Sequence, residues 1–317
     1  MSASERPGRL ERDGWIGYRS ANPFEFSQIL AAPADAAEQA MFGWLLLPEN
    51  APERVPVVVC LHGSMGWRGH HHEHMVRWLE AGIGVFRVHS FEARRVVSVV
   101  EDQMAVTSAM LLNDAYRALE LLTQHTRVIA DRVGITGWSL GGSAALYAGY
   151  EPLREALVGA DGPRFAAHLP FYPAAHVQPQ EQRWTSAPIL TLSGGADDYT
   201  PAHFVTQLIE LAGDSANMRA VIYPDAHHSF DSVEPLTWLP DAIRLGKNPT
   251  LLEKDGRMVA IGASGKRYDV SDPSGRREVF AKKRTLGAHI GGDWDARRRS
   301  FADGEAFFRE FLLGDRV

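Results

Sequence analysis

One short segment, residues 132–148, constrains the fold more than any other part of the chain. The run at 132–136 is typical of a buried strand, and the sequence Gly-Trp-Ser-Leu-Gly follows at 137–141. The small residues at 142–148 then favour a helix that packs closely under a sheet. This order predicts a sharp strand-to-helix turn with glycines where a side chain would clash. Ser139, at the centre of the turn, is the candidate nucleophile.

Backbone N–H groups near this turn could hold an oxyanion. Leu140 lies at the N-terminus of the expected helix, where backbone N–H groups have no acceptor within the helix and carry partial positive charge. Five consecutive apolar residues at 57–61 favour a central parallel strand, and the sequence His-Gly-Ser-Met-Gly follows it. We expect the second oxyanion donor to be the N–H of Ser64 or of Met65.

Two aspartates compete for the role of the catalytic acid. A core strand is expected at 187–192, and the turn after it contains Asp197 and Asp198. We favour Asp197, because a turn that ends the strand points its carboxylate into the crevice at the carboxyl edge of the sheet. Asp198 is nearer to the start of the next helix, where capping is the expected role.

Two histidines compete for the role of the base. They follow the strand expected at 219–223, and both lie in the loop 224–230. We favour His228 over His227, because a small residue and then a phenylalanine follow it, as suits a loop histidine that contacts both nucleophile and acid. The chain order is then serine, aspartate, histidine, which differs from the trypsin-like and subtilisin-like orders.

Taken together, these motifs resemble the dienelactone hydrolase family of the α/β-hydrolases over residues 40 to 230. The motifs that carry the resemblance lie at residues 62–66, 90–94, 114–116, 137–142, 171–173, 194–198 and 223–230. The resemblance implies an α/β-hydrolase fold, with a mostly parallel central sheet and helices on both faces. It also implies two-step hydrolysis of carboxylic esters through an acyl-enzyme, with no cofactor.

The nucleophile departs from the family pattern. The founding enzymes of the family use cysteine, whereas this chain has Ser139 in the turn. Its only cysteine, Cys60, falls within an expected central strand and is predicted to be a buried apolar residue. We likewise expect the neighbouring His62 to brace its loop and not to act as a base. The expected substrates are therefore those of serine esterases: small esters, lactones or oligomeric polyesters.

The remaining elements alternate as a doubly wound sheet requires. Further strands are expected at 42–47, 84–88 and 164–169, a long amphipathic helix at 102–125, and a last helix at 295–313.

The 317 residues are expected to form one domain with an insertion. The insertion is expected at 231–290, between the base loop and the last helix, and it includes a small hairpin at 258–262 and 266–270. The pattern leaves open whether this segment covers the site as a lid or is a peripheral decoration.

Several side chains on the expected loops are candidates for the substrate pocket. The aromatic candidates are Trp67, Trp138, Tyr172 and Tyr199. Arg94 could bind a substrate carboxylate, although bracing of the loop around Phe91 and Asp102 is the favoured role. Residues 70–74, His-His-His-Glu-His, have the composition of a metal site, but no third ligand follows at a recognised spacing, so no metal is expected.

Composition limits the partners. The net charge of −6 argues against a nucleic acid or an anionic membrane as partner. Residues 1–8 lack the apolar core of a signal peptide, so the cytoplasm is the expected location. The expected partners are an ester substrate and water, with the oligomeric state open. The alternatives are a serine peptidase or amidase of the same fold, and an inactive homologue that binds a ligand.

Overall fold

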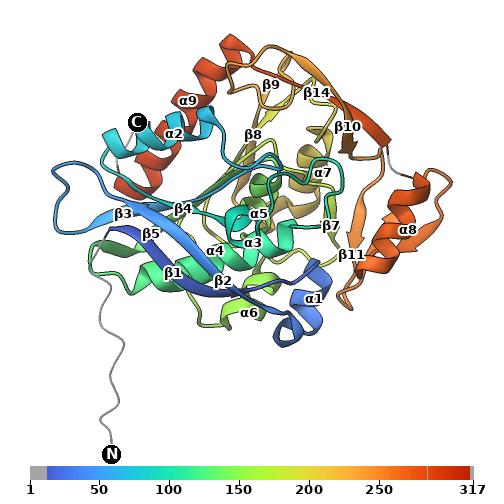
Figure 1. Cartoon of the computed structure of the whole chain (residues 1–317), viewed down its shortest axis with the longest axis horizontal. Coiled ribbons are helices and arrows are strands. Elements are labelled where there is room, and N and C mark those ends of the chain that lie inside the picture. The colour runs from blue at the N-terminus through green and yellow to red at the C-terminus, as the bar shows by residue number, and fades with distance from the viewer. Residues whose placement is uncertain (1–12, 284, 315–317) are drawn as a thin grey trace, which may run out of the picture.

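The computed structural model describes residues 13–283 and 285–314, and within them an eight-stranded sheet forms the centre of the molecule (Figure 1). The strands lie in the order β1 (Gly14–Ala21), β2 (Glu38–Leu46), β4 (Gly84–Val88), β3 (Val55–Leu61), β5 (Val128–Trp138), β6 (His168–Phe171), β8 (Ile189–Gly194) and β9 (Met218–Tyr223). β2 is antiparallel to both of its neighbours, β1 and β4, and all the other pairs are parallel. This arrangement confirms the α/β-hydrolase fold.

Helices cover both faces of the sheet. They are α1 (Phe26–Ala31), α2 (Gly69–Glu80), α3 (Ser90–Arg94), α4 (Ser108–Thr123), α5 (Leu140–Tyr147), α6 (Glu151–Val158), α7 (His203–Ala212), α8 (Pro273–Lys283) and α9 (Trp294–Phe308), which a π-helical turn at Arg309–Leu313 extends. α2 and α9 pack together on one side of the sheet (Figure 1), whereas α4 and α5 lie on the other.

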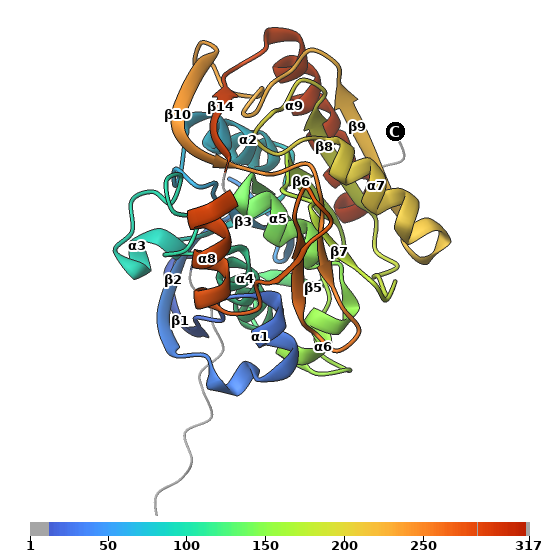
Figure 2. The same ribbon diagram turned by 90° about the vertical axis from the view of Figure 1, so that its right-hand side faces the viewer.

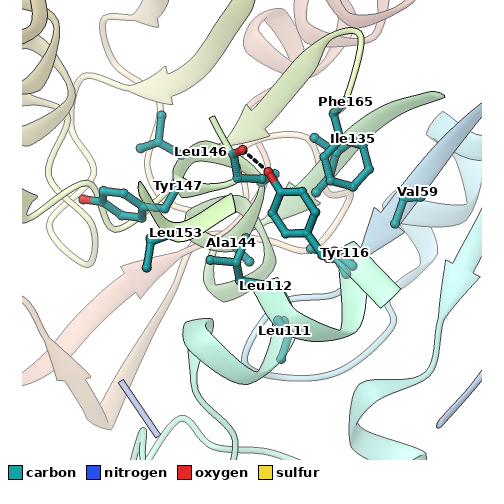
Figure 3. Packing of buried hydrophobic residues seen from close by; sticks show 14 of the residues in the cluster. Val59, Leu111, Leu112, Tyr116, Ile135, Ala144, Leu146, Tyr147, Leu153 and Phe165 are labelled. Carbon is teal, nitrogen blue, oxygen red and sulfur yellow. Dashed lines mark hydrogen bonds between the residues drawn. The ribbon is translucent and has the colours of Figure 1, made fainter. Parts of the chain in front are cut away.

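Strand β3 shows why the central strands are apolar throughout. Val57 and Val59 belong to the core beneath α4 and α5, whereas Val58 and Cys60 belong to the core beneath α2 and α9. Successive side chains point to opposite faces, so a strand covered on both faces buries every residue. In the first of these cores the Tyr116 hydroxyl donates to a backbone carbonyl, that of residue 148, at 2.5 Å (Figure 3).

The segment between the base loop and α9 forms two smaller sheets. One consists of β10 (Thr237–Arg244) and β14 (Thr285–Ile290), and the other of β13 (Arg267–Asp269), β12 (Met258–Ile261), β11 (Thr250–Leu252) and β7 (Val177–Pro179). Antiparallel pairing of β12 with β13 confirms the expected hairpin. Figure 2 shows α8 between the β10–β14 ribbon and α1.

Some expected element boundaries were wrong. The long helix begins at Ser108 and not at 102, because Thr107 caps it by accepting a hydrogen bond from Met110 N–H, while the Asp102 side chain accepts from Met104 N–H in the preceding turn. The strand expected at 164–169 is β6, which begins only at residue 168. β1 and α1 had not been anticipated.

Within the described ranges, no helix has both the length and the apolar character needed to cross a membrane. The N-terminal stretch 1–8, on which the expectation about a signal peptide rests, lies outside those ranges.

Candidate active site

The turn that carries Ser139 connects β5 directly to α5. Ser139 has a φ of +54°, in a region that residues other than glycine rarely adopt. A Cβ on Gly137 would lie 2.3 Å from the carbonyl oxygen of Gly141, and a Cβ on Gly141 would lie 2.5 Å from the carbonyl oxygens of Leu61 and His62. Both glycines are therefore sterically required, and the strained turn presents the Ser139 hydroxyl above the carboxyl edge of the sheet.

Three side chains from separate loops meet at this turn. His228 Nε2 lies 2.9 Å from Ser139 Oγ, and His228 Nδ1 lies 2.8 Å from Asp197 Oδ2. All three residues are buried, with exposed fractions of 9% for Ser139, 5% for Asp197 and 3% for His228. The structure thus brings together the serine, the histidine and the aspartate that the sequence favours.

The Asp197 carboxylate is held by its own loop. The backbone N–H groups of Tyr199 and Thr200 donate to its Oδ1 at 2.8 and 2.9 Å. The Thr200 hydroxyl lies 3.0 Å from both Asp197 Oδ2 and His228 Nδ1, and 3.0 Å from the carbonyl oxygen of Tyr172. Thr200 was missed at the sequence level, although a hydroxyl three residues after the acid was a usable signal.

Asp198 does not cap the following helix. Its carboxylate accepts hydrogen bonds from the backbone N–H of His289 at 2.8 Å and faces the His289 ring, with Oδ2 2.9 Å from Nδ1. The expected capping role was wrong, because a strand of the insertion, β14, lies against this loop and supplies a closer partner. Gly291, directly after β14, reaches the base loop, where its N–H donates to the His228 carbonyl at 2.9 Å.

Two cavities meet at Ser139. The larger has a volume of about 440 Å³ and extends beneath the insertion, and the smaller has a volume of about 200 Å³ and lies beside His228. Ser64 and Tyr199 line both cavities. The insertion therefore forms part of the wall above the serine and is not a peripheral decoration.

The backbone expected to hold an oxyanion borders these cavities. Leu140 is the first residue of α5, so its N–H has no acceptor within the helix. The loop after β3 approaches closely, because a Cβ on Gly63 would lie 3.6 Å from Ser139 Cβ. Ser64 lines both cavities, whereas Met65 is 39% exposed and lines the smaller one. The choice between their N–H groups stays a prediction.

Comparison with known proteins places the chain in a family. The sequence profile of the dienelactone hydrolase family matches residues 41–237. The chain belongs to the dienelactone hydrolase family. As a member of that family it is a hydrolase with the α/β-hydrolase fold. None of the curated proteins matches it in sequence.

Two solved structures are among those to which the chain is similar. One is a dienelactone hydrolase-like promiscuous phosphotriesterase from metagenomic libraries, which is 15% identical with a TM-score of 0.51 over 94% of this chain and 99% of that one. The other is the apo form of esterase 2 from Thermogutta terrifontis, which is 16% identical with a TM-score of 0.49 over 60% of this chain and 80% of that one.

Cys60 of this dienelactone hydrolase family member does not lie at the turn. It is a fully buried residue of β3, and burial raises the pKa of its thiol well above the ordinary value. A thiol is nucleophilic as the thiolate, so this environment suits an apolar structural residue.

The neighbouring His62 braces its loop. Phe91 N–H donates to its Nε2 at 3.3 Å, so Nδ1 carries the proton and donates to the Gly63 carbonyl at 2.9 Å. Burial lowers the pKa of His62 to about 4, which keeps the ring neutral near pH 7. Both nitrogens are occupied, as a bracing role requires.

The aromatic pocket candidates divide into two groups. Tyr199 lines both cavities, and Trp138 and Tyr172 line the smaller one. Trp67 is not among the described residues that line either cavity, so its assignment as a pocket residue was wrong. Its ring instead packs against the His72 ring and the guanidinium of Arg87, which lie beside each other.

The assignment of Arg94 to the pocket was also wrong. Its guanidinium forms a buried, bidentate ion pair with the Asp114 carboxylate at 2.7 and 3.0 Å, and it donates to Asn22 Oδ1 at 2.7 Å. Arg94 does brace the structure, as favoured: it also donates to the Ser90 carbonyl beside Phe91 at 3.1 Å, but its carboxylate partner is Asp114 and not Asp102. An arginine with these bonds has no free edge to offer a substrate carboxylate.

A buried carboxylate lies behind the site and was missed in the sequence. Asp231 accepts hydrogen bonds from the Tyr172 hydroxyl at 2.8 Å and from the Trp138 indole at 3.0 Å. It also faces His74 Nε2 at 3.2 Å and His70 Nε2 at 3.8 Å. Burial alone would raise the pKa of Asp231, but the two histidines and these hydrogen bonds hold it well below its ordinary value. The histidine-rich segment is thus part of an internal polar network beneath two pocket residues.

Proposed function

We propose that this hydrolase cleaves carboxylic esters, with Ser139 as the nucleophile. His228 Nε2 takes the hydroxyl proton as Ser139 Oγ attacks the carbonyl carbon, and it returns that proton to the leaving alcohol. Water then attacks the acyl-enzyme with the same help from His228 and releases the acid. Asp197 fixes the tautomer of the histidine and stabilises the imidazolium.

The observation that carries this proposal is the continuous hydrogen-bonded series from Asp197 through His228 to Ser139, with distances of 2.8 and 2.9 Å. A serine hydroxyl is activated when a base lies within hydrogen-bonding distance of it and a third group orients that base. Two cavities adjoin the serine, so an ester has room on both sides of the carbonyl that is attacked.

The oxyanion would bind to backbone N–H groups. Leu140 N–H, at the start of α5, supplies one donor, and Ser64 or Met65 N–H in the loop after β3 supplies the second. Such preorganised donors typically contribute about 10²–10³ in turnover each.

The larger cavity favours esters with a sizeable apolar group. Its volume of about 440 Å³ falls within the range of roughly 300–1,000 Å³ that is usual for small-molecule sites. Much of its wall is aliphatic or aromatic: Phe26, Val177, Ile243, Met258, Ile261 and Phe280. An aliphatic acyl chain would bury its surface there, at about 0.8 kcal/mol for each methylene.

A series of p-nitrophenyl esters of increasing acyl length tests the proposal. We expect kcat/KM to rise from acetate to octanoate, and expect Ile261→Trp, which fills part of the larger cavity, to lower the octanoate value about tenfold while affecting acetate less. Leu211→Trp on the exposed face of α7 is the matched control.

Two results would contradict the proposal. Faster turnover of p-nitroanilides than of the matching esters would favour the amidase alternative. Equal losses for acetate and octanoate in Ile261→Trp would remove the assignment of the larger cavity to the acyl chain.

A further inference from the structure

We propose that Asp198, His227 and His289 form a binding site for one divalent transition metal ion. One ligand atom from each residue lies within 4.8 Å of the others. The three residues come from separate parts of the chain: the loop after β8, the loop after β9, and strand β14 of the insertion. The site is independent of the proposed ester hydrolysis, because it uses none of the hydrogen-bonding atoms of Ser139 or His228.

The geometry is partly organised for a metal. Asp198 Oδ2 lies 2.9 Å from His289 Nδ1, while its Oδ1 accepts from the His289 backbone N–H at 2.8 Å, which orients the carboxylate. The ring centres of His227 and His289 are 5.4 Å apart. The Trp238 ring packs against His289 at 4.7 Å and limits its rotation.

A second observation points to a ligand at this place. Within the described part of the chain, Nδ1 of His227 is buried and has no hydrogen-bond partner. A buried polar atom without a partner is costly, and a bound ion would satisfy this nitrogen. Here the unpartnered nitrogen belongs to a histidine that already lies beside a second histidine and a carboxylate.

The donor set indicates the class of ion. Two imidazoles and one carboxylate suit Zn²⁺ and related transition metals, with water in the remaining position. Mg²⁺ and Ca²⁺ prefer sites made wholly of oxygen atoms. Arg244 lies nearby, with Nη1 3.8 Å from Asp198 Oδ2, and its charge opposes binding of a cation. Its side chain is one-third exposed, so it can turn toward solvent when an ion binds.

Binding would link the insertion to the loops of the catalytic residues. Asp198 and His227 each directly neighbour a member of the hydrogen-bonded series, Asp197 and His228. His289 lies on β14, which pairs with β10 above the two cavities. The ion would therefore hold the wall of the pocket against the acid and base loops.

Zinc titration of the whole purified chain tests this site. After treatment with a chelator and its removal, calorimetry with ZnCl₂ is expected to give one ion per chain, and Zn²⁺ is expected to raise the Tm. His227→Gln and His289→Gln should each weaken the Kd for Zn²⁺ about tenfold or more. His203→Gln, an exposed histidine on α7, is the control and should bind as the parent does.

The variant Arg244→Gln distinguishes this site from other possible zinc sites, because here the substitution is expected to increase the affinity for Zn²⁺. Removal of the nearby positive charge should tighten Zn²⁺ binding and leave the stoichiometry at one. Zinc affinity unchanged in both His227→Gln and His289→Gln would overturn the proposal. So would loss of binding in His70→Gln instead, because that result would place the ion in the histidine-rich helix α2.

Discussion

At the scale of single residues, the Thr200 hydroxyl connects two members of the proposed catalytic series. It lies 3.0 Å from Asp197 Oδ2 and 3.0 Å from His228 Nδ1, and it also contacts the Tyr172 carbonyl. Within such a buried network each group restricts the orientation of the others. Thr200 therefore acts as a positioning residue for the histidine.

Thr200→Val tests this role, because valine keeps the volume and removes the hydroxyl. We expect kcat/KM for p-nitrophenyl esters to fall about tenfold, which corresponds to about 1.4 kcal/mol in the barrier. Thr200→Ser retains the hydroxyl and should recover most of the activity. Full activity in Thr200→Val together with a loss in Thr200→Ser would show that packing by the methyl group matters and not the hydrogen bonds.

Residues within motifs could be identified from the sequence, and residues joined only by folding could not. Ser139 follows from glycines whose spacing the turn requires, and the favoured members of the aspartate and histidine pairs are the ones that meet it. Asp231 had no such signal, because its partner His74 is 157 positions away in the sequence. The search for a third ligand near the histidines in sequence could not find a carboxylate that only the tertiary structure brings to them.

At the scale of elements, the buried Asp114 carboxylate joins β1, α3 and α4. Ser20 on β1 donates to it at 2.5 Å, Ser90 on α3 donates at 2.7 Å, and Arg94 forms the ion pair. Each carboxylate oxygen thus has a donor in addition to the arginine. A buried charge of this kind is costly to leave without its partner.

Arg94→Ala should therefore lower the free energy of unfolding by about 3–5 kcal/mol. Arg19→Ala is the matched control, since it removes an exposed ion pair to Glu38 and should cost about 1 kcal/mol or less. Denaturant unfolding measures both values. If Arg94→Ala instead raised the KM for an ester with a carboxylate group and left stability unchanged, the pocket role that we reject would be restored.

Elements with a clear pattern of apolar residues could be predicted from the sequence. Elements whose limits depend on a capping residue or on a distant strand were harder to predict. The apolar character of β3, β4 and β8 identified these strands, because strands covered on both faces bury nearly every position. β1, with the partly buried Tyr18 and the exposed Arg19, carries a weaker pattern and pairs at the edge of the sheet. The start of α4 depends on the Thr107 cap, which periodicity does not register.

At the scale of the whole molecule, buried neutral histidines couple stability to pH. Burial lowers the pKa of His62 and of His168 to about 4, whereas an unfolded histidine titrates near 6.5. The unfolded chain therefore binds more protons between about pH 6.5 and 4, and stability falls as the pH decreases through that window. Asp231 acts at lower pH, because its stabilising contribution is present above the ordinary aspartate pKa and is lost below it.

Unfolding by urea at pH 7, 6 and 5 should show this decline, with about 2 kcal/mol lost from each of the two histidines over this range. His168→Gln keeps a donor for the Ala145 carbonyl but cannot titrate. We expect it to reduce the slope of the unfolding free energy below pH 6.5 by about 1.4 kcal/mol per pH unit. If the unfolding free energy of His168→Gln had the same slope against pH as that of the parent protein, the assigned pKa of His168 would be contradicted.

The central claim, that Ser139 is the nucleophile, is tested most directly by mass spectrometry after reaction with a fluorophosphonate. Ser139 Oγ would form a bond to phosphorus and release fluoride, so the account predicts one adduct per chain, located on the peptide that contains Ser139. The adduct should be absent in Ser139→Ala and present in Cys60→Ala. An adduct on Cys60, or ester hydrolysis that continues in Ser139→Ala and stops in Cys60→Ala, would contradict it.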